Sequence, residues 1–290
     1  MDLCHTGTIR ELLERHGFRF SKAMGQNFLI ESSVPARIAE EAGLQGCGVL
    51  EIGPGIGCLT QHIASYAEKV VAVEVDKRLI PVLAETVGGL SNVEVVQGDI
   101  LKLSIPALVS EKLAGLPLQV CANLPYNITT PVLSVLFESS LFERITVMIQ
   151  REVAHRICAK PGTADYGAFT VYANYHTQPK ILFDVSPDCF MPRPKVTSTV
   201  ITMQRREHPP CPAPDEKMFF RVVRAAFSQR RKTLVNCLAG IAGEAFTKDE
   251  LGLLLERQGL NRMVRGEALD IPQFAEIAAA LKSALEGRDA

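Results

Sequence analysis

The pattern of apolar and polar positions divides the chain into a part with strands and helices and a later part with helices only. Between residues 48 and 150, short and almost continuously apolar runs alternate with stretches whose apolar residues have the spacing of a helix face. The runs are GVLEIG, VVAVEV, VEVVQG, LPLQVCA and ITVMIQ, and the helical stretches are LTQHIASYA, KRLIPVLAETV and PVLSVLFESS. Such alternation is typical of a parallel sheet covered on both faces. The pattern therefore predicts an α/β fold.

Further elements are expected before and after this alternation. Thr8 and Glu11 have the spacing of a capping box and predict the start of a first helix. A second helix is expected to have Ser33 as its N-cap and to stop at Gly43. The later segments KILFDV and KVTSTVITMQ predict antiparallel strands at one edge of the sheet.

A proline-rich segment, REHPPCPAPDEK, separates the α/β part from a helical part. The helical part contains MFFRVVRAAFSQRRKTLVNCLAG, KDELGLLLERQG and PQFAEIAAALKSALEG. We therefore expect two domains. The first is a Rossmann-like domain with an N-terminal helical extension over residues 1–207, and the second is a small all-helical domain over residues 213–290.

A glycine-rich segment, EIGPGIG, lies where the first strand should turn into a helix. Glycines there let the backbone approach a ligand closely, although they also serve turns that bind nothing. A dinucleotide-binding loop has glycines at the first, third and sixth positions, whereas the sixth position counted from Gly53 is Cys58. A G-x-G-x-G pattern preceded by an acid is similar to the loop of methyltransferases that bind S-adenosylmethionine. The spacing therefore argues against a nicotinamide dehydrogenase.

Two acids follow at the ends of the next two strands. Glu74 can accept hydrogen bonds from both hydroxyls of a ribose, and Asp99 can accept one from an adenine amino group while Ile100 packs on the ring. Either acid by itself is more often a solvated strand end. The glycine loop, Glu74 and Asp99 follow three successive strands. Together they favour one ligand site, because ligands of open α/β sheets bind at the carboxyl ends of the strands.

The tetrapeptide NLPY, Asn123 to Tyr126, ends the fourth strand. By itself it could be an ordinary turn. Beside a methyl donor, the Asn123 side-chain oxygen and the Leu124 carbonyl could accept the two hydrogens of an adenine amine and turn its lone pair toward the methyl group. Pro125 would rigidify the turn, and Tyr126 offers a face on which an extruded base can stack.

Motifs along nearly the whole chain resemble those of the KsgA-type ribosomal RNA adenine dimethyltransferases. The matching segments are GQNFL, EIGPGIG, QGDIL, NLPYNITTP, IQREVAHRICAKPGTADYGAFTV, FMPRPKVTS and AAFSQRRKTLVN, of which the last three are the most specific. The resemblance implies a Rossmann-like S-adenosylmethionine-dependent methyltransferase domain followed by a helical domain. It also implies transfer of two methyl groups to N6 of each of two adjacent adenines near the 3′ end of 16S rRNA.

The resemblance assigns roles to individual residues. The implied cofactor contacts are Asn27, Leu29, Gly53, Glu74, Asp99 and Asn123. The implied catalytic residues are Asn123, Leu124, Pro125 and Tyr126, with Phe190 as a second aromatic wall opposite Tyr126. Without the resemblance, Phe190 would be interpreted as a core residue beside a proline-rich turn.

Charge is distributed unevenly along a chain whose net charge is −1. Residues 191–232 contain ten basic and three acidic side chains, a net of +7, so the remainder carries −8. The candidate RNA-binding residues in this segment, at helical spacings, are Arg221, Arg224, Arg230, Arg231 and Lys232. A solvated helix face is the alternative, but the absence of acids between Lys217 and Gly243 favours contacts to RNA phosphates.

Composition sets limits on the other function classes. None of the eight cysteines has the C-x-x-C spacing of a zinc or redox site, and the six histidines form no ligand pair, so no metal is expected. The N-terminal segment has neither an apolar signal region nor an Arg-rich transit composition, and no run is long enough to span a bilayer. We expect a cytoplasmic monomer that acts on 16S rRNA within the immature small ribosomal subunit.

Two alternatives besides the dehydrogenase stay open. The first is the related 23S rRNA adenine dimethyltransferase group, which shares fold and chemistry, although NLPY and the extended AAFSQRRKTL region are more similar to the 16S group. The second is a non-catalytic nucleic-acid-binding relative. The presence of Glu74, Asn123 and Tyr126, and the absence of a transit peptide, argue against it.

Overall fold

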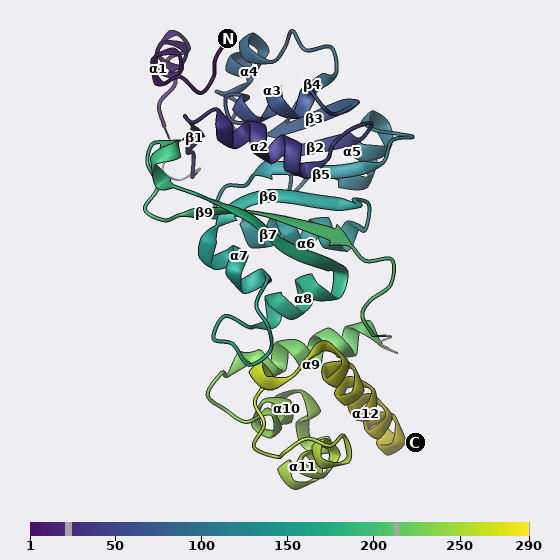
Figure 1. Ribbon diagram of the computed structural model, residues 1–290. Helices are drawn as coiled ribbons and strands as arrows, with labels where there is room; N and C mark the ends of the chain where they lie inside the picture. The colour runs from purple at the N-terminus through teal and green to yellow at the C-terminus, as the bar shows by residue number, and fades with distance from the viewer. Residues whose placement is uncertain (21–24, 212–214, 290) are drawn as a thin grey trace. The chain divides into compact units, whose positions relative to one another are not determined.

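The computed structural model describes residues 1–20, 25–211 and 215–289, and the chain divides into two compact units (Figure 1). The first unit consists of Met1–Ala154 and Pro179–Arg205, and the second consists of His155–Gln178 and Arg206–Ala290.

A seven-stranded sheet with the order β4-β3-β2-β5-β6-β9-β7 forms the centre of the first unit. Its parallel strands are β2 (Gly48–Ile52), β3 (Lys69–Glu74), β4 (Val93–Gln97), β5 (Leu118–Asn123) and β6 (Arg144–Gln150). The strand β9 (Ser198–Arg205) pairs antiparallel with β6, and β7 (Thr177–Val185) lies at the edge beside β9. The predicted strands and the antiparallel edge are confirmed.

The strand order places a switch point between β2 and β5. From β2 the chain proceeds outward to β3 and β4, and then it returns to β5 on the other side of β2. A right-handed crossover on each side puts helices on both faces, and the loops beyond the strand ends diverge at the switch point. This divergence opens the crevice in which ligands of such sheets bind.

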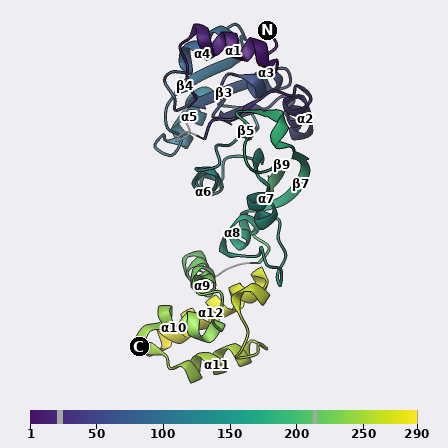
Figure 2. The ribbon, with the colours of Figure 1, turned by 90° about the vertical axis from the view of Figure 1, so that its left-hand side faces the viewer.

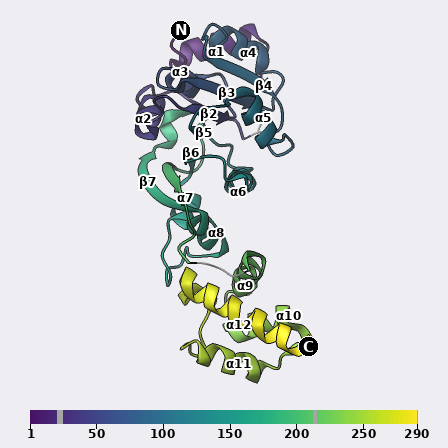
Figure 3. The same ribbon diagram turned by 90° about the vertical axis from the view of Figure 1, so that its right-hand side faces the viewer.

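Helices cover both faces of this sheet. They are α2 (Ser33–Ala42), α3 (Cys58–Ala64), α4 (Ile80–Thr86), α5 (Ile105–Lys112) and α6 (Thr129–Ser139). Figures 2 and 3 show α2 and α3 on one face, and α5 and α6 on the other. The helix α5 was not among the expected elements, although Ser104 accepts a hydrogen bond from the Ala107 amide as its N-cap and Pro106 lies in its first turn.

Two expected helix starts are wrong in detail. The helix α1 (Thr6–Arg15) begins before Thr8, so the Thr8 amide donates to the His5 ring at 3.4 Å, and His5 takes the capping role expected of Thr8. The helix α2 includes Ser33, whose amide and hydroxyl pair with Glu31 rather than capping the helix. Gly43 ends α2 as predicted, in the left-handed conformation that glycine favours.

The second unit contains helices around an apolar core. They are α8 (Ala168–His176), α9 (Glu216–Ser228), α10 (Leu234–Ala242), α11 (Lys248–Arg257) and α12 (Ile271–Asp289), and α7 (Arg151–Ile157) leads into the unit. The apolar face of α9 buries Phe219, Val222 and Val223 against the other helices. The long stretch expected to be helical from Met218 is interrupted between Ser228 and Leu234.

The sequence-based domain boundaries placed His155–Gln178 in the first domain, whereas this segment groups with the helices of the second unit. Tyr166 gives the reason. Its hydroxyl donates to the Leu269 carbonyl at 2.8 Å, and its ring packs edge-on against Phe227 at 5.8 Å. Tyr175 likewise packs on Phe219. These contacts join residues far apart in sequence, so no local pattern marks them.

Candidate active site

A cavity opens at the carboxyl ends of β2, β3, β4 and β5 in the first unit. It encloses about 980 Å³ when the open space at its mouth is included. Its walls contain every residue expected in the cofactor and catalytic sites: Asn27, Leu29, Gly53, Glu74, Asp99, Asn123, Leu124, Pro125, Tyr126 and Phe190. The structure therefore brings together residues spread over more than half of the sequence.

The glycine loop after β2 forms one wall of the cavity. Gly53, Gly55 and Gly57 all have positive φ angles of 70°, 62° and 93°. A Cβ atom on Gly57 would lie 2.7 Å from the Val87 side chain, so a larger residue there would require that side chain to shift. The loop is shaped by backbone conformations that favour glycine, which brings its amides close to the cavity.

Glu74 is held at the end of β3 by the backbone. Its carboxylate accepts hydrogen bonds from the Asp76 amide at 2.8 Å and from the Gly55 amide at 3.3 Å. Burial raises the pKa of Glu74, and these amide hydrogen bonds offset part of that effect. Asp99 follows β4, accepts from the Leu101 amide at 3.1 Å and lies 3.6 Å from the Lys102 ammonium. Both carboxylates are thus fixed beside the cavity.

The NLPY turn supplies hydrogen-bond acceptors. Asn123 is the last residue of β5, and the Leu124 amide donates to the Met148 carbonyl at 3.1 Å, which continues the pairing with β6. The Pro125 carbonyl accepts from the Ile128 amide and from the Thr129 hydroxyl. Among the described residues, neither the Asn123 side chain nor the Leu124 carbonyl has a hydrogen-bond partner. These two acceptors line the cavity and are available to a ligand.

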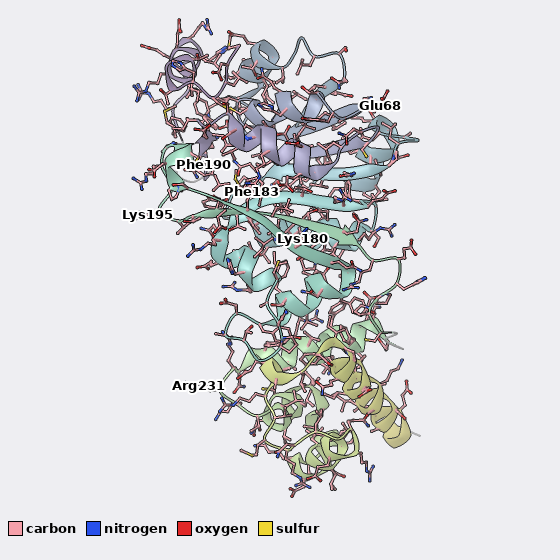
Figure 4. The ribbon with its side chains drawn as sticks, viewed as in Figure 1. Glu68, Lys180, Phe183, Phe190, Lys195 and Arg231 are labelled. Carbon is pink, nitrogen blue, oxygen red and sulfur yellow. The ribbon has the colours of Figure 1, made fainter. Side chains whose placement is uncertain are left out.

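Two aromatic rings complete the cavity. The Tyr126 hydroxyl lies 2.7 Å from the hydroxyl of Ser198, and burial raises the pKa of Tyr126, so the phenol stays protonated. Phe190, labelled in Figure 4, is 3% exposed and belongs to the two-residue strand β8 (Phe190–Met191). There it pairs with Leu29 of β1 (Phe28–Leu29). Phe190 is therefore both a buried residue and part of the cavity wall.

Glu51 is a cavity residue to which the sequence analysis assigned no role. It is 1% exposed, and its Oε2 atom has no hydrogen-bond partner in the described part of the chain. Burial raises the pKa of Glu51 to about 8, the nearby Thr60 hydroxyl lowers it in part, and the charge of Glu74 raises it further. The sequence marks Glu51 only by its position at the start of EIGPGIG. Its burial and its unpaired oxygen arise only in the folded chain.

The five candidate RNA-binding residues are all exposed, but they do not share one helix face. Arg230, Arg231 and Lys232 lie in the turn after α9, which corrects the expected helical spacing. Arg221 donates to the Ile241 carbonyl at 2.8 Å, and Arg230 donates to the Ala164 carbonyl at 2.5 Å. Among residues that the structure describes, no partner exists for the side chains of Arg224, Arg231 (Figure 4) and Lys232.

Within the described ranges, no group of three or more His, Cys, Asp or Glu side chains is arranged to hold a metal ion. No helix in the described part of the chain is both long enough and apolar enough to cross a bilayer.

Comparisons with known proteins agree on one family. The chain matches the family model of ribosomal RNA adenine dimethylases over residues 17–280. It is 43% identical over 284 residues to the ribosomal RNA small subunit methyltransferase A of Geobacillus thermodenitrificans, and the match covers 97% of each chain.

Two solved structures share the fold. A dimethyladenosine transferase from Plasmodium falciparum has a TM-score of 0.73 and 24% identity, with 89% of this chain and 98% of that chain covered. The 23S rRNA methyltransferase ErmE has a TM-score of 0.67 and 27% identity, with 88% and 99% covered. With the family match over most of its length, the chain belongs to the ribosomal RNA adenine dimethylase family.

Proposed function

We propose that this protein transfers methyl groups from S-adenosylmethionine to N6 of two adjacent adenines near the 3′ end of 16S rRNA. The products are N6,N6-dimethyladenosines, and the substrate is the immature small ribosomal subunit in the cytoplasm. The protein acts as a monomer. The observation that carries the proposal is the pair of unpartnered acceptors, Asn123 and the Leu124 carbonyl, in a cavity that also contains two aromatic walls.

The donor groups of the cavity fit S-adenosylmethionine. The unpartnered, buried Glu51 oxygen suits the ammonium group of its methionine part, and Glu74 suits the ribose hydroxyls. Asp99 suits the adenine amino group. Asn27, Leu29 and Gly53 also line the cavity. When bound, the cofactor supplies an activated methyl group attached to a sulfonium.

The NLPY turn would make the target amine nucleophilic. The lone pair of an adenine amine is delocalised into the ring. The Asn123 side-chain oxygen and the Leu124 carbonyl would accept its two hydrogens and favour the tetrahedral form, whose lone pair is available. The rings of Tyr126 and Phe190 would hold the base between them. Orientation and hydrogen bonding therefore account for the activation without a strong general base.

The small-subunit substrate is favoured over the 23S alternative by the pattern of similarity. The relative from Geobacillus thermodenitrificans, named for the small subunit, is 43% identical to this chain, whereas ErmE is 27% identical. A non-catalytic nucleic-acid-binding role is disfavoured, because the acceptors and both aromatic walls are present in one cavity.

Methyl transfer tests the proposal directly. The protein is incubated with labelled S-adenosylmethionine and either unmethylated small subunits or unmethylated 23S rRNA, and the products are digested to nucleosides. We expect labelled dimethyladenosine from the small subunit only. Label in 23S rRNA alone would move the protein to the other substrate group, and no label in either would favour the non-catalytic role.

The unpartnered cations of the second unit are expected to bind RNA phosphates. Replacing Arg231 and Lys232 by Gln should reduce the slope of log affinity against log salt concentration by about 1.4 to 1.8, because each phosphate contact releases counterions. The measurement is RNA binding at several salt concentrations. Lys180→Gln, at an exposed lysine of β7 (Figure 4), is the control and should leave the slope unchanged. An unaltered slope in the double variant would remove these residues from the RNA interface.

A further inference from the structure

Ser198, the first residue of β9, is a fully buried polar residue that the proposed chemistry leaves without a role. Its backbone lies opposite Gln150 at the end of the pairing with β6. Its hydroxyl oxygen lies 2.7 Å from the Tyr126 hydroxyl oxygen. Burying a hydroxyl is unfavourable without a hydrogen bond, so the contact with Tyr126 explains why a serine is tolerated here.

The contact with Ser198 is the only polar anchor of the Tyr126 ring among the described residues. The backbone before this residue is already held, because the Pro125 carbonyl accepts from Ile128 and Thr129. The ring itself rotates about two side-chain torsions. The hydroxyl oxygen lies on the axis about which the ring turns, so its hydrogen bond fixes the direction of the side chain. Because a phenol O–H prefers the plane of its ring, the same hydrogen bond also favours one orientation of the ring's face toward the cavity.

The same short segment of chain also carries the other aromatic wall. Phe190 of β8 and Ser198 of β9 are separated by seven residues, 191–197. Phe190 is anchored by its pairing with Leu29, and the start of β9 is anchored where the Arg151 amide donates to the Thr197 carbonyl at 3.0 Å. One segment anchored at both ends therefore positions Phe190 directly and Tyr126 through the Ser198 hydroxyl.

We propose that Ser198 is a positioning residue for methyl transfer, which holds the Tyr126 ring in the orientation that stacks the target adenine. The proposal rests on the proposed function, because it assigns Tyr126 to the base. Ser198 does not touch the substrate. It acts through Tyr126 and keeps the ring ordered before the base arrives, so that less ordering is needed on binding.

A double-mutant cycle tests this role. Ser198→Ala and Tyr126→Phe each remove one partner of the same hydrogen bond. We expect each variant to lower kcat/KM for the small subunit about three- to tenfold, and the combined variant to lose no more than either single one. Ser198→Thr, which keeps the hydroxyl, should retain most of the activity. Binding of S-adenosylmethionine should be unchanged in all of them.

Thr202→Val is the matched control, because it removes a 3.2 Å hydroxyl contact with Thr146 between the same strands, β6 and β9. We expect this variant to keep the parent rate at a temperature where it is folded. Parent-like activity in Ser198→Ala, additive losses in the double variant, or an equal loss in Thr202→Val would each overturn the role of Ser198. The parent rate is measured first: an inactive parent would refute the proposed function, whereas an active parent with additive losses refutes only this inference.

Discussion

Replacing Asn123 by Ala is expected to remove most methyl transfer and to leave the fold in place. The Asn123 side chain makes no hydrogen bond within the described residues, so its loss leaves no protein group unpaired. In the transition state it would be one of two acceptors for the adenine amine. Removing one such preorganised group typically costs about 3 to 4 kcal/mol, so we expect kcat to fall by roughly 10²- to 10³-fold.

The measurement is kcat at saturating S-adenosylmethionine, together with thermal unfolding of the variant. Asn92→Ala is a matched control, which we expect to lower stability rather than activity. The Asn92 side chain donates to the Ala64 and Ala67 carbonyls at 2.9 and 3.0 Å, away from the cavity. This control should therefore unfold more easily and keep its rate while folded. An unchanged rate in Asn123→Ala would refute the assigned role of the amide.

The cavity could be predicted from sequence because its parts lie at the ends of strands that the hydrophobic pattern marks clearly. Glu74 and Asn123 each close an apolar run, and the carboxyl ends of parallel strands lie at one edge of a sheet. Local periodicity and this one topological rule are therefore sufficient to predict that Glu74 and Asn123, 49 positions apart, lie beside the same cavity. Phe190 is different, because its place in the cavity was implied by family resemblance alone.

Other features depend on contacts that no local pattern contains. The unpaired oxygen of Glu51 and the hydrogen bond between Ser198 and Tyr126 exist only once the chain is folded. Arg230 was interpreted as one of several equivalent surface cations, yet its guanidinium bonds the Ala164 carbonyl, 66 residues away in sequence. Composition predicts that a segment is basic, but it does not predict which of its cations are already used by the protein.

The Glu51→Gln variant should be more stable than the parent at pH 8 and should bind S-adenosylmethionine more weakly. Burial raises the pKa of Glu51 in the folded protein to about 8, from an ordinary value of 4.5. Between these values the folded protein keeps a proton that the unfolded chain has lost. The free energy of unfolding therefore falls as pH rises through this window, by up to about 1.4 kcal/mol per pH unit. A glutamine is neutral throughout, so the variant should lack this part of the slope and gain on the order of 4 kcal/mol at pH 8.

Denaturant unfolding of the parent and the variant between pH 5 and 8.5 measures this difference. Glu68→Gln is the control, because Glu68 is exposed and lies outside the cavity (Figure 4), and it should leave the slope unchanged. Parallel pH profiles for the parent and Glu51→Gln would mean that Glu51 is already ionised in the folded protein. That result would contradict the effect of burial on its pKa.

The same substitution separates stability from function. An ammonium group beside Glu51 would favour the carboxylate, so binding of S-adenosylmethionine to the parent below pH 8 should release a proton. Calorimetry in buffers of different ionisation enthalpy measures this release, and we expect it to be absent in Glu51→Gln. The loss of a charge-assisted hydrogen bond should weaken binding by roughly 10- to 100-fold. Undiminished affinity in the variant would mean that the buried carboxylate serves another purpose than holding the cofactor, because Glu51 would then lower stability without any gain in binding.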